Sequence, residues 1–230
     1  MRGVPEDPGQ DSGLRAVTEG PDGRPPTVVL LLRHGQTELS AERRFVGRED
    51  IPLTKAGLKQ ARAAARRLAS SDVNLIVTSP SRRARHTAEA VAEATAAPLA
   101  VDDDLVEADF GAWYGMTFAE VGRQFPDALA AWLSSPDAAP PDGESFAAVA
   151  KRVFAALDRL LDAHRQSTIV VVSHVTPIKT VLCRALLAPP AAMFRMQLDV
   201  ASLSQIDFFA DGQCVVRSLN DTAHLRGRLR

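Results

Sequence analysis

Positions 28–32 form an unbroken apolar run that is followed directly by Arg33, His34 and Gly35. A short apolar run of this kind predicts a strand covered on both faces, as in a parallel sheet flanked by helices. Ligands of open α/β sheets bind outside the carboxyl ends of the strands. We therefore expect Arg33 and His34 to face a cleft, with Gly35 allowing the chain to turn. The alternative is a hydrogen-bonded core histidine beside an arginine at the rim of the core.

Strand and helix patterns alternate through the rest of the chain. Apolar runs predict strands at 75–79, 99–101 and 168–173, and a terminal antiparallel hairpin from 201–209 and 214–219. Helical spacing and capping residues predict helices over about 54–68, 82–95, 146–161 and 176–187. This alternation predicts an α/β fold in which neighbouring strands pair in parallel.

Two helix starts carry specific expectations. Thr54 is expected to cap the first helix, whose apolar face would contain Leu58, Ala61, Ala65 and Leu68. Ser81 follows Pro80 and is expected to cap the second helix.

The chain divides by composition into a polar segment and one domain. Residues 1–26 are rich in Gly, Pro, Asp and Arg and have few apolar positions, so we expect a disordered tail or linker. The chain is 46% hydrophobic, which is ample for a single core, and one domain is expected over 27–230. Residues 102–143 lose the regular spacing, and we expect this excursion to leave the sheet and cover the functional site.

Composition argues against several classes of function. With 27 Lys and Arg against 28 Asp and Glu, the net charge of −1 gives no basic field for nucleic acid. No apolar run approaches the about 18 residues of a membrane span, and the N-terminus lacks the apolar core of a signal peptide. Cys183 and Cys214 have no CxxC spacing, so we expect reduced thiols in a cytoplasmic protein.

The strongest pattern joins two strands that end in the same way, one on Arg33-His34 and the other on Ser173-His174. If these strands are neighbours in a parallel sheet, the two imidazoles meet over one cleft. Arginines and helix N-termini both favour phosphate oxygens, and Arg83 opens the helix after the second strand. The sequence therefore predicts an anion site at this edge of the sheet.

Phosphoryl transfer needs mainly positioning and charge stabilisation, which Arg33, Arg83 and His174 can supply without a metal. A neutral imidazole of His34 can attack phosphorus through a phosphohistidine intermediate. Glu107 is the best candidate acid for the leaving group, with Asp109 as its competitor. No metal site or cofactor is expected, since two histidines and distant carboxylates fit no ligand spacing and the arginines would repel a cation.

Four motifs in this order resemble the histidine phosphatase superfamily, also called the phosphoglycerate mutase-like family: Arg33-His34-Gly35-Gln36-Thr37, Arg83-Ala84-x-x-Thr87, Glu107-x-x-Phe110-Gly111 and Ser173-His174. The resemblance covers about residues 27–220 and implies three α/β/α layers around a mostly parallel sheet. It implies that His34 is the phosphorylated nucleophile and Glu107 the proton donor. Arg33, Arg83 and His174 would bind the phosphoryl group, and Thr37 and Ser40 are added as substrate-binding candidates.

Within the family, the chain looks most like the acid phosphatase half of bacterial proteins that carry a ribonuclease H domain in front, and like α-ribazole phosphatases. The stretches at 33–40, 107–113 and 173–180 carry this likeness. Since only the polar residues 1–26 precede the first strand, we expect either a stand-alone relative or the trailing half of a two-domain protein.

The sequence is compatible with three functions. The first is hydrolysis of a small phosphorylated metabolite, with α-ribazole 5′-phosphate as one candidate. The second is a phosphoglycerate-type mutase, against which Phe110 argues because the mutase pattern has Tyr there. The third is a binding module for phosphorylated ligands, which would not need the acid Glu107. The terminal hairpin is compatible with a homodimer.

Overall fold

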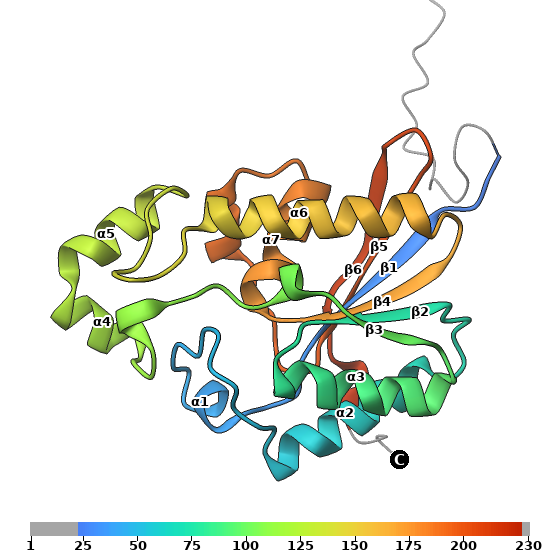
Figure 1. The fold of residues 1–230 in the computed structure, drawn as a ribbon, viewed down its shortest axis with the longest axis horizontal. Coiled ribbons are helices and arrows are strands. Elements are labelled where there is room, and N and C mark those ends of the chain that lie inside the picture. The colour runs from blue at the N-terminus through green and yellow to red at the C-terminus, as the bar shows by residue number, and fades with distance from the viewer. Residues whose placement is uncertain (1–22, 227–230) are drawn as a thin grey trace, which may run out of the picture.

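The computed structural model describes residues 23–226 and contains a six-stranded sheet in the order β3-β2-β4-β1-β5-β6 (Figure 1). Most of the predicted tail, residues 1–22, lies outside the described residues. The strands are β1 (Thr27–Arg33), β2 (Leu75–Thr78), β3 (Leu99–Val101), β4 (Thr168–Ser173), β5 (Leu203–Phe208) and β6 (Cys214–Asp221). All of the predicted strands are therefore present.

Strand pairing confirms a mostly parallel sheet. β4 lies between β1 and β2 and is parallel to both, while β3 extends the sheet in parallel beside β2. β5 runs antiparallel to β1 and forms the predicted hairpin with β6. The β1–β4 register pairs Arg33 with Ser173, so that His34 and His174 leave the sheet at the same edge.

Helices cover both faces of the sheet and complete the three α/β/α layers (Figure 1). One face carries α2 (Lys55–Leu68) and α3 (Arg82–Thr95), whose buried side chains are mainly alanines that let the helices lie close together. The other carries α6 (Phe146–Ala163) and α7 (Val175–Ala185), which pack through larger aliphatic residues. No helix between residues 23 and 226 is long and apolar enough to cross a membrane.

The start of α2 differs from the expectation. Thr54 caps the helix as predicted, since its side chain accepts a hydrogen bond from the Gly57 N–H. Leu58, however, is 39% exposed, and Gly57 takes the buried position. A side chain at Gly57 would meet the Gln36 carbonyl oxygen at 2.1 Å, so the helix approaches the loop after β1 through a glycine.

Two further helix ends differ in detail from the expectation, although α3 (Arg82–Thr95) has the predicted bounds. Ser81 is the N-cap residue of α3, but its side chain caps no backbone group; the Arg82 N–H donates instead to the Asp50 carboxylate at 2.6 Å. α7 begins one residue early, with His174 as its N-cap residue, and ends at Ala185. Leu187, the predicted end, has a left-handed φ of 50°.

The excursion at 102–143 contains two short 3₁₀ turns (Asp103–Leu105 and Gly111–Trp113) followed by α4 (Phe118–Gln124) and α5 (Pro126–Ser134). Its own core is aromatic: Trp113 is fully buried and meets Trp132 edge to face, with ring centroids 5.4 Å apart. The short helix α1 (Glu38–Ala41) belongs to the loop after β1, and the excursion faces this loop in Figure 1. An isolated antiparallel β-bridge between Arg44 and Thr117 connects the two segments.

Candidate active site

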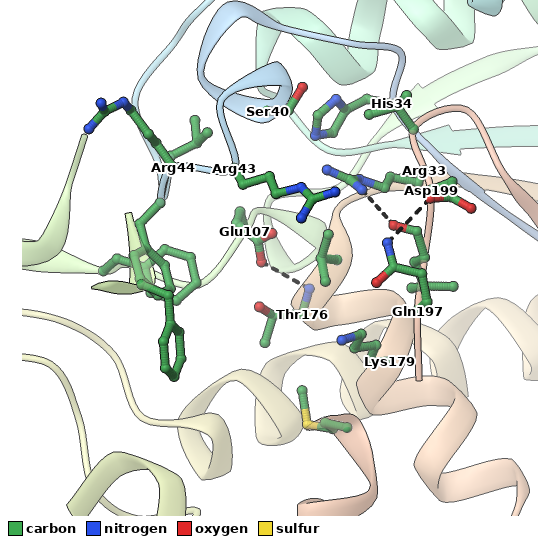
Figure 2. Close-up of a pocket in the computed structure, with 18 of the residues that line it drawn as sticks. Arg33, His34, Ser40, Arg43, Arg44, Glu107, Thr176, Lys179, Gln197 and Asp199 are labelled. Carbon is green, nitrogen blue, oxygen red and sulfur yellow. Dashed lines mark hydrogen bonds between the residues drawn. The ribbon is translucent and has the colours of Figure 1, made fainter. Parts of the chain in front are cut away.

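A cavity of about 740 Å³ opens at the carboxyl end of β1, bounded by the loop after β1, the excursion, α7 and residues 193–200 (Figure 2). Arg33, His34, Ser40, Arg83 and Glu107 line it. His174 is adjacent to His34, with the two ring centroids 5.0 Å apart. The structure thus brings together most of the residues that the sequence singles out.

The two histidines are held in defined orientations. Nδ1 of His34 lies 2.7 Å from the Gly35 carbonyl oxygen, which can only accept, so Nδ1 carries the proton and Nε2 keeps its lone pair. Nε2 of His174 lies 2.8 Å from the Ser79 hydroxyl, and its Nδ1 is buried without a partner among the described residues. The hydrogen bond to the Gly35 carbonyl therefore leaves the lone pair of His34 Nε2 free to act as a nucleophile. The Nδ1 atom of His174 is free to form a hydrogen bond to a ligand.

Burial keeps both imidazoles neutral. It lowers the pKa of His34 and of His174 well below the usual 6.5, and the positive charge of Arg83 lowers both values further. A neutral imidazole is the form that acts as a nucleophile, because protonation removes its lone pair.

Arg33 and Arg83 present positive charge beside the histidines. Arg33 donates to the Leu198 carbonyl at 2.6 Å, and Arg83 donates to the carbonyls of Glu49 and Gly47 at 2.6 and 2.7 Å. The Nε atoms of both arginines are buried without partners among the described residues. Burial lowers the pKa of Arg33 to about 10, so it stays charged at neutral pH. Fixed, charged and incompletely bonded guanidinium groups suit a phosphate.

Glu107 is the carboxylate that faces the cavity. Its Oε1 accepts hydrogen bonds from the Ala108 N–H at 2.9 Å and from the Thr176 N–H, near the start of α7, at 3.2 Å. Asp109, its competitor, accepts from the Gly111 N–H at 2.9 Å and is not among the residues lining the cavity. The geometry therefore favours Glu107 as the acid.

Thr37 and Ser40 have different positions. Thr37 is fully buried, is absent from the cavity wall and caps α1, where its hydroxyl accepts from the Ser40 N–H. Ser40 lines the cavity, but its hydroxyl donates to the Thr37 carbonyl at 2.9 Å and accepts from the Thr37 N–H. A substrate-binding role for either residue stays a prediction, and their hydrogen bonds serve the capping box of α1.

Arg152 was missed by the sequence analysis. It projects from α6 and donates to the backbone carbonyls of Asp104, Val106 and Glu107 while pairing with Glu144 at 2.9 Å. It thereby fixes the segment that presents Glu107. An arginine on an amphipathic helix gives no sequence signal of this kind, because most such residues face water.

Within residues 23–226, no group of three or more His, Cys, Asp or Glu side chains is arranged to hold a metal ion. The positive charges of Arg33 and Arg83 beside the histidines oppose binding of a cation there. The site is built for an anion.

Comparison with known proteins connects this geometry to a family. A sequence model of the histidine phosphatase superfamily (branch 1) matches residues 29–222. A bifunctional protein of Mycobacterium tuberculosis is 48% identical over 201 residues, which cover 87% of this chain and 55% of that protein. The chain therefore spans about half the length of this relative.

Two phosphatases are similar over nearly their whole length. Phosphoserine phosphatase 1 of Hydrogenobacter thermophilus is 32% identical, covering 86% of this chain and 93% of that protein. A mycobacterial glucosyl-3-phosphoglycerate phosphatase, solved with VO3, superposes with a TM-score of 0.79 at 30% identity and covers 85% of this chain and 100% of that one. The resemblance read from the motifs is thus confirmed, and the chain belongs to the histidine phosphatase superfamily.

Proposed function

We propose that the chain is a metal-independent phosphomonoester hydrolase that works through a phosphohistidine on His34. The tautomer of His34 carries the proposal, because the hydrogen bond to Gly35 leaves the Nε2 lone pair free next to buried, unpartnered nitrogens. Glu107 beside this anion site favours turnover over binding alone, since a binding module would not need an acid.

In the first half-reaction, Nε2 of His34 attacks phosphorus, the N–P bond forms, and the P–O bond to the leaving group breaks. Arg33, Arg83 and the Nδ1–H of His174 stabilise the charge that develops on the equatorial oxygens. Glu107 donates a proton to the leaving oxygen, so the first product departs as an alcohol.

In the second half-reaction, the Glu107 carboxylate accepts a proton from water while the water oxygen attacks phosphorus. The N–P bond breaks, inorganic phosphate leaves, and His34 recovers its lone pair. Glu107 is again protonated, so the cycle closes without a metal or another co-reactant.

The substrate is proposed to be a small phosphorylated metabolite. The similar proteins named above act on phosphoserine and on glucosyl-3-phosphoglycerate, both phosphomonoesters. The sequence suggests α-ribazole 5′-phosphate as a further candidate. All three carry a phosphoryl group, which would bind at the His34 end of the cavity. They differ in the rest of the molecule, which would occupy the remaining cavity.

The test is to trap the intermediate. After brief reaction with p-nitrophenyl phosphate, an alkaline quench preserves phosphohistidine, and peptide mass spectrometry is expected to find the phosphoryl group on His34. His34→Ala should abolish both this label and phosphate release, whereas His164→Ala, which changes a histidine outside the cavity, should leave both intact. Activity that needs an added divalent cation after EDTA treatment would contradict the metal-free mechanism.

The mutase alternative differs in the fate of the phosphoryl group. Phe110 lines the cavity and packs on Phe45 with ring centroids 4.7 Å apart, so its position contributes no hydroxyl to the site. In water enriched in oxygen-18, a hydrolase should release labelled phosphate from 3-phosphoglycerate. Isomerisation without release would favour the mutase.

A further inference from the structure

The cavity is much larger than the phosphoryl site that the mechanism uses. In the mechanism proposed above, the phosphoryl group is bound at the edge of the sheet by Arg33, Arg83 and His174, each of which has a buried nitrogen without a partner among the described residues. The cavity volume of about 740 Å³ falls within the range of sites that enclose whole small molecules. The outer cavity must therefore contact the rest of the substrate, and its charged side chains indicate what that part is.

Cationic side chains outnumber carboxylates in the cavity as a whole. The cavity is lined by five cationic side chains and two carboxylates, which are Arg33, Arg43, Arg44, Arg83, Lys179, Glu107 and Asp199. Arg44 is already paired with Glu42 at 2.6 Å and Glu120 at 2.8 Å. Asp199 accepts hydrogen bonds from Gln197 and Asn220. Arg33 and Arg83 belong to the phosphoryl end of the cavity, so Arg43 and Lys179 are the two remaining cations of its wall.

Arg43 has a left-handed backbone conformation, and its guanidinium has no partner within residues 23–226. Its φ of 57° lies in the left-handed region, a conformation that is common at the residue following a helix C-cap and that glycine adopts without strain. Arg43 follows shortly after α1, and its side chain points in a different direction from that of Arg44 (Figure 2). The Arg44 guanidinium instead donates to the Gly115 carbonyl of the excursion. The guanidinium of Arg43 lines the cavity and has no hydrogen bond or ion pair with any residue in 23–226.

Lys179 approaches from the opposite wall, on α7 (Figure 2). It is half-buried and has no hydrogen-bond or ion-pair partner among residues 23–226. Burial lowers its pKa, and the charge of Arg33 adds to this effect, whereas Glu107 opposes it. A partly desolvated ammonium group without a partner is costly, and a bound anion would offset that cost.

We propose that Arg43 and Lys179 form a second anion subsite, so that the substrate is a phosphomonoester carrying a second acidic group. This inference rests on the hydrolase function proposed above and specifies its substrate class. A carboxylate or a second phosphoryl group would supply the required chemistry. The second group would lie in the outer cavity while the reacting phosphoryl group occupies the His34 end.

The experiment compares pairs of substrates that differ only in the second acid. Phosphoserine against phosphoethanolamine tests a carboxylate, and 1,3-propanediol bisphosphate against propyl phosphate tests a second phosphoryl group. The readout is the ratio of kcat/KM within each pair, which a general loss of activity does not change. The wild-type protein is expected to favour the acidic member of at least one pair by about tenfold or more.

Two substitutions remove the subsite with little effect on folding. Arg43→Gly suits the left-handed φ and deletes the charge, and Lys179→Gln keeps much of the side chain. The double variant should bring the ratio close to one, whereas Arg85→Ala, an exposed arginine outside the cavity, should leave it unchanged.

The outcomes separate the two proposals. Hydrolysis of all four substrates with ratios near one, or a preference that survives in the double variant, would overturn the subsite and leave the hydrolase intact. The hydrolase itself fails if none of the four substrates, nor p-nitrophenyl phosphate, releases phosphate. A preference lost in the double variant supports the subsite, and the pair that shows it identifies the second group.

Discussion

The two ends of the cavity are built in different ways. At the sheet edge, His34 and His174 extend neighbouring parallel strands, and nearly every side chain is buried and fixed by backbone groups. At the outer end, aromatic side chains from separate helices and loops line the wall, and Phe118 and Phe194 are 49% and 43% exposed. In the function proposed here, the rigid sheet edge would carry the chemistry, while the outer end would select the molecule that undergoes it.

The largest effect should come from the sheet edge. Arg83→Ala removes a buried guanidinium from the phosphoryl site, and kcat/KM for p-nitrophenyl phosphate should fall on the order of a hundredfold or more. Arg82→Ala changes the adjacent exposed arginine and should have little effect. Steady-state kinetics of the two variants decide this, and equal losses would mean that net charge rather than position matters.

Glu107→Gln should separate substrates by leaving group. An alkyl phosphate needs the proton and should lose on the order of ten- to a hundredfold more activity than p-nitrophenyl phosphate. Asp109→Asn preserves the acceptor for the Gly111 N–H and should show no such difference. Similar losses on both substrates for Glu107→Gln would remove it from the role of acid.

A tight backbone contact supports the sheet edge at Gly57, whereas Gly122 in α4 has no such contact. Gly57→Ala places a methyl group against the Gln36 carbonyl and should lower the free energy of unfolding by about 1–3 kcal/mol. Gly122→Ala lies in α4, where the nearest atom would be a Leu129 methyl at 3.5 Å, and should be neutral or slightly stabilising. Urea unfolding of both variants tests this contrast.

The pH dependence should report the buried histidines. Because their folded-state pKa lies well below 6.5, the unfolded chain binds protons that the folded chain does not as the pH falls below about 6.5. Their stabilising contribution is complete above that value and is lost at lower pH, by up to about 1.4 kcal/mol per pH unit for each imidazole. Replacing His174 with Gln should reduce the slope of stability against pH.

The smallest effect is expected at the outer wall. Phe118→Ala removes a half-exposed ring and should raise KM a few-fold for a substrate that reaches this wall, with kcat nearly unchanged. A large fall in kcat would show that the aromatic wall also orders the sheet edge. Measuring kcat and KM separately distinguishes these results.

The sequence predicted the strands well, because each strand pattern depends on residues that are close in the chain. The prediction that two similar strand ends meet is confirmed by the β1–β4 pairing. The burial of Leu58 and the side-chain cap by Ser81 were mispredicted. The contact of Gly57 with Gln36 decides the first, and the hydrogen bond from Arg82 to Asp50 decides the second. Both Gln36 and Asp50 belong to another segment of the chain.

What the sequence determined by itself is a mostly parallel α/β sheet in which two similar strand ends meet at one edge, since apolar periodicity and strand ends are local properties. The tertiary structure alone decided which carboxylate faces the cavity, because Glu107 is held by Thr176, 69 residues away, and by Arg152. It also decided the tautomer of His34 and the orientation of Arg43 and Lys179 into one cavity. These features depend on contacts between segments far apart in the chain, which no local pattern encodes.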